Sequence, residues 1–201
     1  MRNLDNIESL LALNPDFVGF IFYKKSKRFV REFPNIIFPK GIKKIGVFVN
    51  ESIRELLRTI DKHQLDGVQL HGNESPEFCD ELVQVLGNKK KSVTIIKAFS
   101  VDEEFDFDFT TPFNRSCDFF LFDTKGKDYG GNGVKFNWKI LENYNGETLF
   151  LLSGGIAKQD VHEIKNFGHK SFWGIDINSG FEIEPGLKNI NEIKEFKLNL
   201  S

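Results

Sequence analysis

The fold is decided by two stretches, FLLSGG at residues 150–155 and GIDINSG at residues 174–180. In each of them an apolar run with the character of a buried strand leads directly into small residues. Small residues let backbone N–H groups approach a phosphate group closely. Barrels of the (β/α)8 type frequently hold a phosphate on the loops after strands 7 and 8. The two stretches therefore predict the last two strands of such a barrel, with a phosphate site at their carboxyl ends.

Five further apolar runs precede these two and complete a set of seven candidate strands. They are rich in Val, Ile and Phe without strict alternation, which is typical of strands buried on both faces of a parallel sheet. Antiparallel hairpins are therefore not expected. The seven candidates are Phe17–Phe22, Lys44–Val49, Gly67–Leu70, Thr94–Ala98, Phe119–Asp123, Phe150–Ser153 and Gly174–Ile177.

Helical periodicity marks several of the segments between the strands. Ser52 and Ser75 stand where a side-chain oxygen can cap the first N–H groups of a helix, and Pro76 suits a first helical turn. The expected helices are Leu4–Leu13, Ser52–His63, Ser75–Leu86 and Lys158–Phe167. The signals are weaker at residues 31–40 and 101–112, which we expect to be loops or single turns.

The number of strands bears on the kind of sheet. Strand ends recur about every 25 residues, the repeat of a closed (β/α)8 barrel or of an open doubly wound sheet. No linker interrupts the repeat, so we expect one domain over residues 1–201. The first element, Leu4–Leu13, has no strand before it. Either the sheet is open, or the chain is an α/β (β/α)8 TIM barrel whose first strand is missing ahead of Met1, and the phosphate signal favours the barrel.

The composition excludes several classes of function. The 201 residues include 27 Lys and Arg against 29 Asp and Glu, and the net charge of -2 gives no reason to expect nucleic acid or an anionic membrane as a partner. A small-molecule phosphorylated ligand is the better expectation. Cys79 and Cys117 lack the spacing of a disulfide framework or a zinc site, and we predict no metal site. No apolar run reaches the roughly 18 residues that span a bilayer, and we expect a cytoplasmic protein.

Polar residues that directly follow predicted strands are the candidates for binding and catalysis, because ligands of parallel βα arrays bind beyond the carboxyl ends of the strands. Arg28 suits a bidentate grip on a carboxylate, and a solvated basic turn is the alternative. Gln69 and His71 end the third strand, where His71 either contacts substrate or caps the next helix. Asp123 ends the fifth strand, where a raised carboxyl pKa would allow general acid catalysis; capping of the next segment is its other possible role.

The predicted phosphate site combines small residues from two loops, Ser153, Gly154 and Gly155 in one and Asn178, Ser179 and Gly180 in the other. Glycines that merely form turns are the alternative. The loop at residues 126–133 contains four glycines and suits a mobile cover over the site. The sequence lacks a Walker pattern, which disfavours a P-loop nucleotide site.

Six segments resemble, in order and spacing, the motifs of the phosphoribosylanthranilate isomerase family, tryptophan-biosynthesis enzymes with a (β/α)8 fold. They are Gly19–Phe29, Gly46–Asn50, Val68–Gly72, Phe122–Lys125, Ser153–Gly155 and Asp176–Gly180. The resemblance implies an internal Amadori rearrangement of N-(5-phosphoribosyl)anthranilate to 1-(2-carboxyphenylamino)-1-deoxyribulose 5-phosphate, without metal or cofactor. The alternatives are an inactive or truncated phosphate-binding relative and another sugar-phosphate barrel enzyme.

The resemblance also implies roles for individual residues. Asp123 is the general acid that protonates the ribose ring oxygen, Arg28 binds the anthranilate carboxylate or orients the substrate, and His71 lies in the pocket. The backbone amides of Gly154, Gly155, Ser179 and Gly180 hold the phosphate. The family's general base is a cysteine in a Lys-x-Cys-Gly motif on the first strand, and this sequence begins where that motif would just have ended. Without that strand we expect a poorly stable monomer, or a homodimer that pairs the open strand edges.

Overall fold

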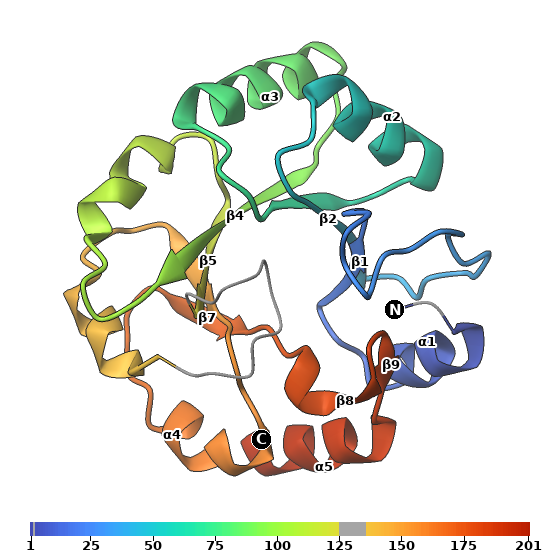
Figure 1. Cartoon of the computed structure of the whole chain (residues 1–201), viewed down its shortest axis with the longest axis vertical. Helices are drawn as coiled ribbons and strands as arrows, with labels where there is room; N and C mark the ends of the chain where they lie inside the picture. The colour runs from blue at the N-terminus through green and yellow to red at the C-terminus, as the bar shows by residue number, and fades with distance from the viewer. Residues whose placement is uncertain (2, 125–135) are drawn as a thin grey trace.

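The computed structural model describes residue 1, residues 3–124 and residues 136–201. Its centre is a curled sheet of seven parallel strands, paired in chain order from the first to the seventh (Figure 1). The strands are β1 (Phe17–Ile21), β2 (Lys43–Phe48), β3 (Gly67–Leu70), β4 (Thr94–Val101), β5 (Phe119–Thr124), β6 (Leu149–Leu152) and β7 (Phe172–Ile175). The predicted parallel α/β sheet is thereby confirmed, as a TIM-barrel-like arrangement.

Helices lie outside this ring of strands (Figure 1). In the described residues they are α1 (Leu4–Leu11), α2 (Ile53–His63), α3 (Pro76–Asn88), α4 (Val161–Lys165) and α5 (Ile190–Leu200), with 3-10 helices η1 (Phe107–Phe113), η2 (Trp138–Asn143), η3 (Lys158–Asp160) and η4 (Ser179–Phe181). Both predicted caps are present, because Ser52 accepts a hydrogen bond from the N–H of Glu55 and Ser75 accepts one from the N–H of Phe78. The helix expected at residues 158–167 is divided between η3 and α4.

The structure differs from the sequence prediction at the end of β4, in the position of β7 and in the segment after β7. Strand β4 runs on to Val101, because Ser100 and Val101 pair with the end of β5. Strand β7 lies two residues earlier than expected, which places Asp176 directly beyond its carboxyl end. A short antiparallel hairpin follows β7, formed by β8 (Glu182–Glu184) and β9 (Leu187–Lys188). Strands this short leave no alternation to read in the sequence.

The sheet is apolar on both faces, which explains why its strands do not alternate in sequence. On β5, Phe120 and Phe122 belong to the large cluster of buried side chains that also contains residues of α2 and α3. The intervening Leu121 belongs to a separate cluster with Ile45 and Leu151, on the inner face of the curl. Strands β2, β4, β5 and β6 therefore each contribute to both of these clusters.

The edges of β1 and β7 do not pair in the part of the chain that the structure describes. Side chains bridge them instead at the amino ends of the strands. The Phe17 ring of β1 stacks on the Trp173 ring of β7, with 5.0 Å between centroids and 17° between planes. Phe119 packs against both rings. A further contact joins α1, which precedes β1, to the hairpin that follows β7: the side-chain amide of Asn6 exchanges two hydrogen bonds with the backbone of Lys188 in β9.

We expect Trp173→Ala to lower the free energy of unfolding by roughly 1 to 2 kcal/mol, because it removes aromatic contacts from a side chain that is 40% exposed. Urea unfolding followed by circular dichroism measures the change. Phe109→Ala is the control, since that ring lies on η1 and is 68% exposed. An equal loss in the two variants would show that the stack does not connect the sheet edges.

Candidate active site

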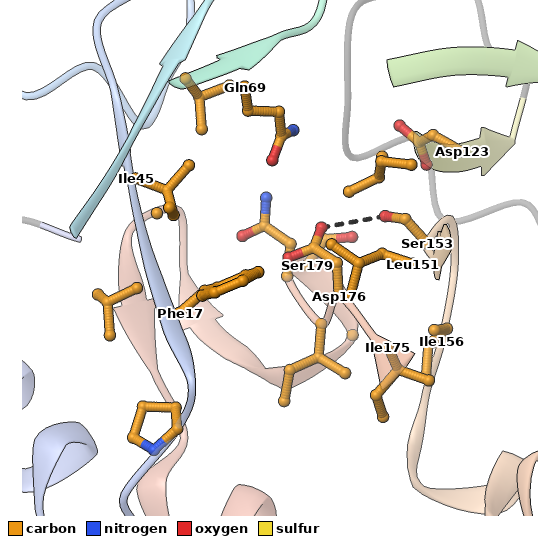
Figure 2. A pocket seen from close by; sticks show the side chains of 18 of the residues that line it. Phe17, Ile45, Gln69, Asp123, Leu151, Ser153, Ile156, Ile175, Asp176 and Ser179 are labelled. Carbon is orange, nitrogen blue, oxygen red and sulfur yellow. Dashed lines mark hydrogen bonds between the residues drawn. The ribbon is translucent and has the colours of Figure 1, made fainter. Parts of the chain in front are cut away.

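A pocket opens at the carboxyl ends of the strands and extends between the edges of β1 and β7. Its cavity volume is about 640 Å³. Apolar side chains of the inner core form part of its wall, and Figure 2 shows Gln69, Asp123 and Asp176 around the same space. The structure brings every predicted site residue to this one pocket: Arg28, Gln69, His71, Asp123, Ser153, Gly154, Gly155, Asn178, Ser179 and Gly180. The loop at residues 126–133, expected to be a cover, lies outside the described residues.

Asp123 is buried at the end of β5, and both of its carboxylate oxygens have neighbours. The backbone N–H of Thr124 donates a hydrogen bond of 3.0 Å to Oδ1. The other oxygen, Oδ2, lies 3.4 Å from Nε2 of His71. This arrangement fixes the plane of the carboxyl group at the pocket wall.

His71 follows β3 directly and faces Asp123 across the pocket mouth. Burial alone would lower the pKa of His71, but the hydrogen bond and the negative charge of Asp123 outweigh it, and the pKa lies above its ordinary value. The pair therefore retains a proton at pH values where an isolated histidine has lost it. Such a pair can deliver a proton to a ligand and take one back.

The turn that carries His71 is shaped by a buried ion pair that sequence reasoning missed. Lys97 of β4 lies 3.2 Å from the Glu74 carboxylate, and its Nζ also donates to the carbonyl oxygen of Gly72 at 2.8 Å. Glu74 in turn accepts hydrogen bonds from the N–H groups of Asn50 and Gly72. A lysine inside the apolar run TIIKAFS was the available signal, because a buried charge requires a partner.

Gln69 lies one residue before the end of β3 and is buried, with its side chain directed to the pocket (Figure 2). Its amide offers both donors and an acceptor, which suits a ligand that carries hydroxyl groups.

Two loops on the other side of the pocket present backbone N–H groups. Gly154 and Gly155 adopt φ angles of +87° and +69°, a region that favours glycine. A side chain at Gly180 would collide with the carbonyl oxygen of Ile156. Within the described part of the chain, no group accepts a hydrogen bond from the N–H groups of Gly154, Gly155, Ser179 or Gly180. These donors are therefore available to an anion.

Asp176 is a second carboxyl group in the pocket, and it was not among the predicted site residues. It follows β7, and its Oδ2 accepts a hydrogen bond of 3.1 Å from the hydroxyl of Ser153 (Figure 2). Burial raises the pKa of Asp176 above its ordinary value, although the charge of Lys188 opposes the shift. Sequence reasoning extended the strand to Ile177, so that Asp176 was counted as part of the strand.

Arg28 lies where the sequence placed it, in the loop after β1, but it already holds a carboxylate of this chain. Its guanidinium pairs with Glu182 of β8, with 2.6 Å between Nη2 and Oε2. The interpretation as a solvated basic turn is wrong for Arg28, because its side chain is only 15% exposed.

Cys79 and Cys117 lie away from the pocket. Both are buried in the large core cluster outside the sheet, Cys79 on α3 and Cys117 just before β5. Their mutual hydrogen bond and burial raise the pKa of Cys117. Neither thiol reaches the pocket wall.

The described residues contain no group of three or more His, Cys, Asp or Glu side chains placed to hold a metal ion. None of the described helices combines the length and the apolar character needed to cross a lipid bilayer.

Comparison with known proteins identifies a family. Residues 1–199 match the family model described as N-(5'phosphoribosyl)anthranilate (PRA) isomerase. The N-(5'-phosphoribosyl)anthranilate isomerase of Parabacteroides distasonis is 46% identical over 204 residues, which cover 98% of this chain and 88% of that protein.

Solved structures agree with the sequence match. The crystal structure of phosphoribosyl anthranilate isomerase from Thermotoga maritima superposes with a TM-score of 0.82 at 31% identity, covering 100% of this chain and 95% of that one. A second crystal structure shows a phosphoribosyl anthranilate isomerase in complex with reduced 1-(o-carboxyphenylamino)-1-deoxyribulose 5-phosphate; its TM-score is 0.78 at 29% identity, with 98% and 93% of the two chains covered. Since sequence and structure match over almost the whole chain, this protein belongs to the N-(5'-phosphoribosyl)anthranilate isomerase family.

Proposed function

We propose that this pocket carries out the reaction of the family, the rearrangement of N-(5'-phosphoribosyl)anthranilate to 1-(2-carboxyphenylamino)-1-deoxyribulose 5-phosphate in tryptophan biosynthesis. The protein is an isomerase of that family, so the proposal concerns which groups of this chain act on the substrate. One observation carries it. A strand-end carboxyl group, Asp123, lines the same pocket as two loops whose N–H groups are available to an anion.

The substrate has two anionic ends, and the pocket offers a separate cationic or donor group for each. The N–H groups of Gly154, Gly155, Ser179 and Gly180 bind the phosphate, because glycine lets the backbone approach its oxygens. Arg28 binds the anthranilate carboxylate with the edge of its guanidinium that Glu182 leaves open. The ribose then lies between the two ends, near Gln69 and Asp123.

Asp123 is the proton donor. Protonation of the ribose ring oxygen lets the bond from that oxygen to C1 break, and an iminium forms between C1 and the anthranilate nitrogen. Loss of the C2 proton gives an enolamine, which tautomerises to the ketone of the product. One proton is delivered and one is removed, so the product is an isomer of the substrate. His71 supports the first step because its proton, held 3.4 Å from Oδ2 of Asp123, can replace the proton that Asp123 gives to the ring oxygen.

Removal of the C2 proton requires a base, for which the family resemblance implies a cysteine. Cys79 and Cys117 are buried outside the pocket. The resemblance implies that this cysteine lies on the first strand of the (β/α)8 pattern, which would be placed between β1 and β7. Two observations support that position: the edges of β1 and β7 do not pair in the described residues, and the pocket extends between them. A strand there would satisfy both edges.

The partner of the site is accordingly a small phosphorylated molecule, and a cytoplasmic location accords with such a substrate. Fractionation of cells with an antibody to the protein tests the location, which recovery in the membrane fraction would contradict.

In a chain with the first strand restored before Met1, Asp123→Asn is expected to lower turnover about 100-fold or more, the usual effect of removing a general acid. Loss of anthranilate-type fluorescence, with freshly prepared N-(5'-phosphoribosyl)anthranilate, measures it. Asp118→Asn is a matched control, because Asp118 precedes β5 at its opposite end. Turnover of Asp123→Asn equal to that of the control would remove Asp123 from the mechanism.

The stabilising effect of His71 is expected to depend on pH. Its pKa is raised in the folded chain, so its contribution to stability is fully present below the unfolded pKa of about 6.5 and is lost as the pH rises through the folded value. The difference in free energy of unfolding between the native chain and His71→Asn should therefore shrink as the pH rises above about 6.5. Urea unfolding at several pH values measures it, with exposed His162→Asn as the control. A difference that grows with pH would contradict the pairing with Asp123.

An added strand tests the placement of the base. A chain extended before Met1 by a strand ending in Lys-Val-Cys-Gly is expected to turn over substrate about 100-fold faster, or more, than the same extension ending in Lys-Val-Ala-Gly. The two extensions differ only in the thiol, so the comparison separates the base from the added packing. Equal rates would exclude the cysteine as the base, and no turnover by either folded chain would favour a phosphate-binding relative without activity.

A further inference from the structure

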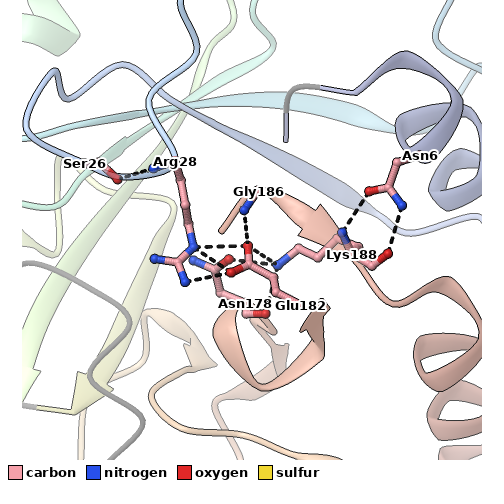
Figure 3. A network of polar contacts seen from close by, with 7 residues as sticks. All are labelled: Asn6, Ser26, Arg28, Asn178, Glu182, Gly186 and Lys188. Carbon is pink, nitrogen blue, oxygen red and sulfur yellow. Dashed lines mark hydrogen bonds and ion pairs between the residues drawn. The ribbon is translucent and has the colours of Figure 1, made fainter. Parts of the chain in front are cut away.

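The carboxylate of Glu182 lies between two cations at the pocket mouth (Figure 3). The Nε of Arg28 donates to both of its oxygens, at 3.0 and 2.8 Å, and Nη2 lies 2.6 Å from Oε2. On the other side, Nζ of Lys188 lies 3.4 Å from Oε1. The backbone N–H of Gly186 donates a further hydrogen bond of 3.1 Å to Oε1. The hairpin β8–β9 thus folds its own carboxylate toward a loop that lies 154 residues away in sequence.

This group of charges is removed from solvent. The Glu182 side chain is 4% exposed and that of Lys188 is 9% exposed. Burial alone would raise the pKa of Glu182, but the hydrogen bond from Arg28 and the charges of Lys188 and Arg28 outweigh it and lower the pKa. Glu182 is therefore ionised, and the three charges leave a net charge of about +1 at the pocket mouth.

Lys188 connects the same carboxylate to the second glycine loop. Its Nζ donates to the backbone oxygen of Asn178 at 2.9 Å and to Oδ1 of Asn178 at 2.8 Å (Figure 3). Asn178 directly precedes Ser179 and Gly180, whose N–H groups are available to an anion. One carboxylate thus lies between Arg28 and the loop that is proposed to bind phosphate.

The geometry leaves part of the guanidinium available to a ligand. Glu182 occupies Nε and Nη2 of Arg28. Among the residues that the structure describes, none accepts a hydrogen bond from Nη1, and Arg28 lines the pocket. An arginine held along one edge loses little further rotational freedom when it binds a carboxylate with the rest of its donors.

We infer that Glu182 is a positioning residue, which fixes Arg28 for one anionic end of the substrate and, through Lys188, fixes the Asn178 loop for the other. The inference rests on the proposed function, because that function supplies the two anionic ends. Glu182 itself touches no reacting atom in this account. It acts through the two cations that it holds.

A role in folding alone is the competing explanation, and a double-mutant cycle separates the two. A carboxylate that only cross-links the fold would change ligand binding by the same factor whether or not Arg28 is present. A positioning residue would lose most of its effect once Arg28 is removed, because coupled residues are not additive.

The experiment measures dissociation constants by calorimetry for reduced 1-(o-carboxyphenylamino)-1-deoxyribulose 5-phosphate and for inorganic phosphate. Glu182→Gln is expected to weaken binding of the reduced analogue about 10-fold or more, but only about 3-fold or less in an Arg28→Ala background. Glu182→Gln should weaken the binding of inorganic phosphate by a similar factor with or without Arg28→Ala. Phosphate binding depends on Glu182 only through Lys188 and the Asn178 loop, not through Arg28. Glu184→Gln is the matched control, because Glu184 lies on the same strand and is exposed.

Each outcome decides one question. A Glu182→Gln dissociation constant within about 2-fold of the Glu184→Gln value would overturn the inference, and so would an equal loss in both Arg28 backgrounds. Failure of the folded native chain to bind the analogue would overturn the proposed function itself, and the inference with it. If Glu182→Gln does not fold, Glu182→Asp takes its place in the cycle, because it keeps the charge and shortens the side chain by one methylene.

Discussion

In the described residues the edges of β1 and β7 have no strand partner, and this gap governs how the sheet is held together. A curled parallel sheet whose end strands do not pair in the described residues loses the hydrogen bonds that would close it, so side chains must hold its two edges together. At the amino ends of the strands, Phe17 stacks on Trp173. At the carboxyl ends, Arg28 pairs with Glu182. The pocket lies between these two bridges, and its shape follows from them.

The charged groups around the pocket are arranged so that each buried one has a partner. Lys97 with Glu74 shapes the turn after β3, and Nε2 of His71 lies 3.4 Å from Oδ2 of Asp123. The trio of Arg28, Glu182 and Lys188 joins the loop after β1 to the loop after β7. A buried charge without a partner is costly, so these contacts hold the site in one geometry before a ligand arrives. A site held in one geometry favours a substrate whose two anionic ends must be bound at a fixed separation.

The sequence predicts local features of this fold well and long-range pairings poorly. Unbroken apolar runs identify all seven strands of the sheet, and residues at or just after the ends of those runs, such as Asp123 and Gly154, lie in the pocket. Asp176 was missed by a shift of two residues in β7. Glu182 was missed because its partner Arg28 is 154 positions away, and no periodicity records such a pair. The end of β4 depends on pairing with β5, which a local pattern does not contain.

We propose that the ligand spans the pocket, from the glycine loops after β6 and β7 to Arg28 after β1. A crystal structure of this chain with reduced 1-(o-carboxyphenylamino)-1-deoxyribulose 5-phosphate tests it most directly. We expect the phosphate oxygens within hydrogen-bonding distance of the N–H groups of Gly154, Gly155, Ser179 and Gly180, the aromatic carboxylate on Arg28, and Asp123 beside the sugar chain. A phosphate bound away from both glycine loops, or a carboxylate that does not contact Arg28, would contradict the account.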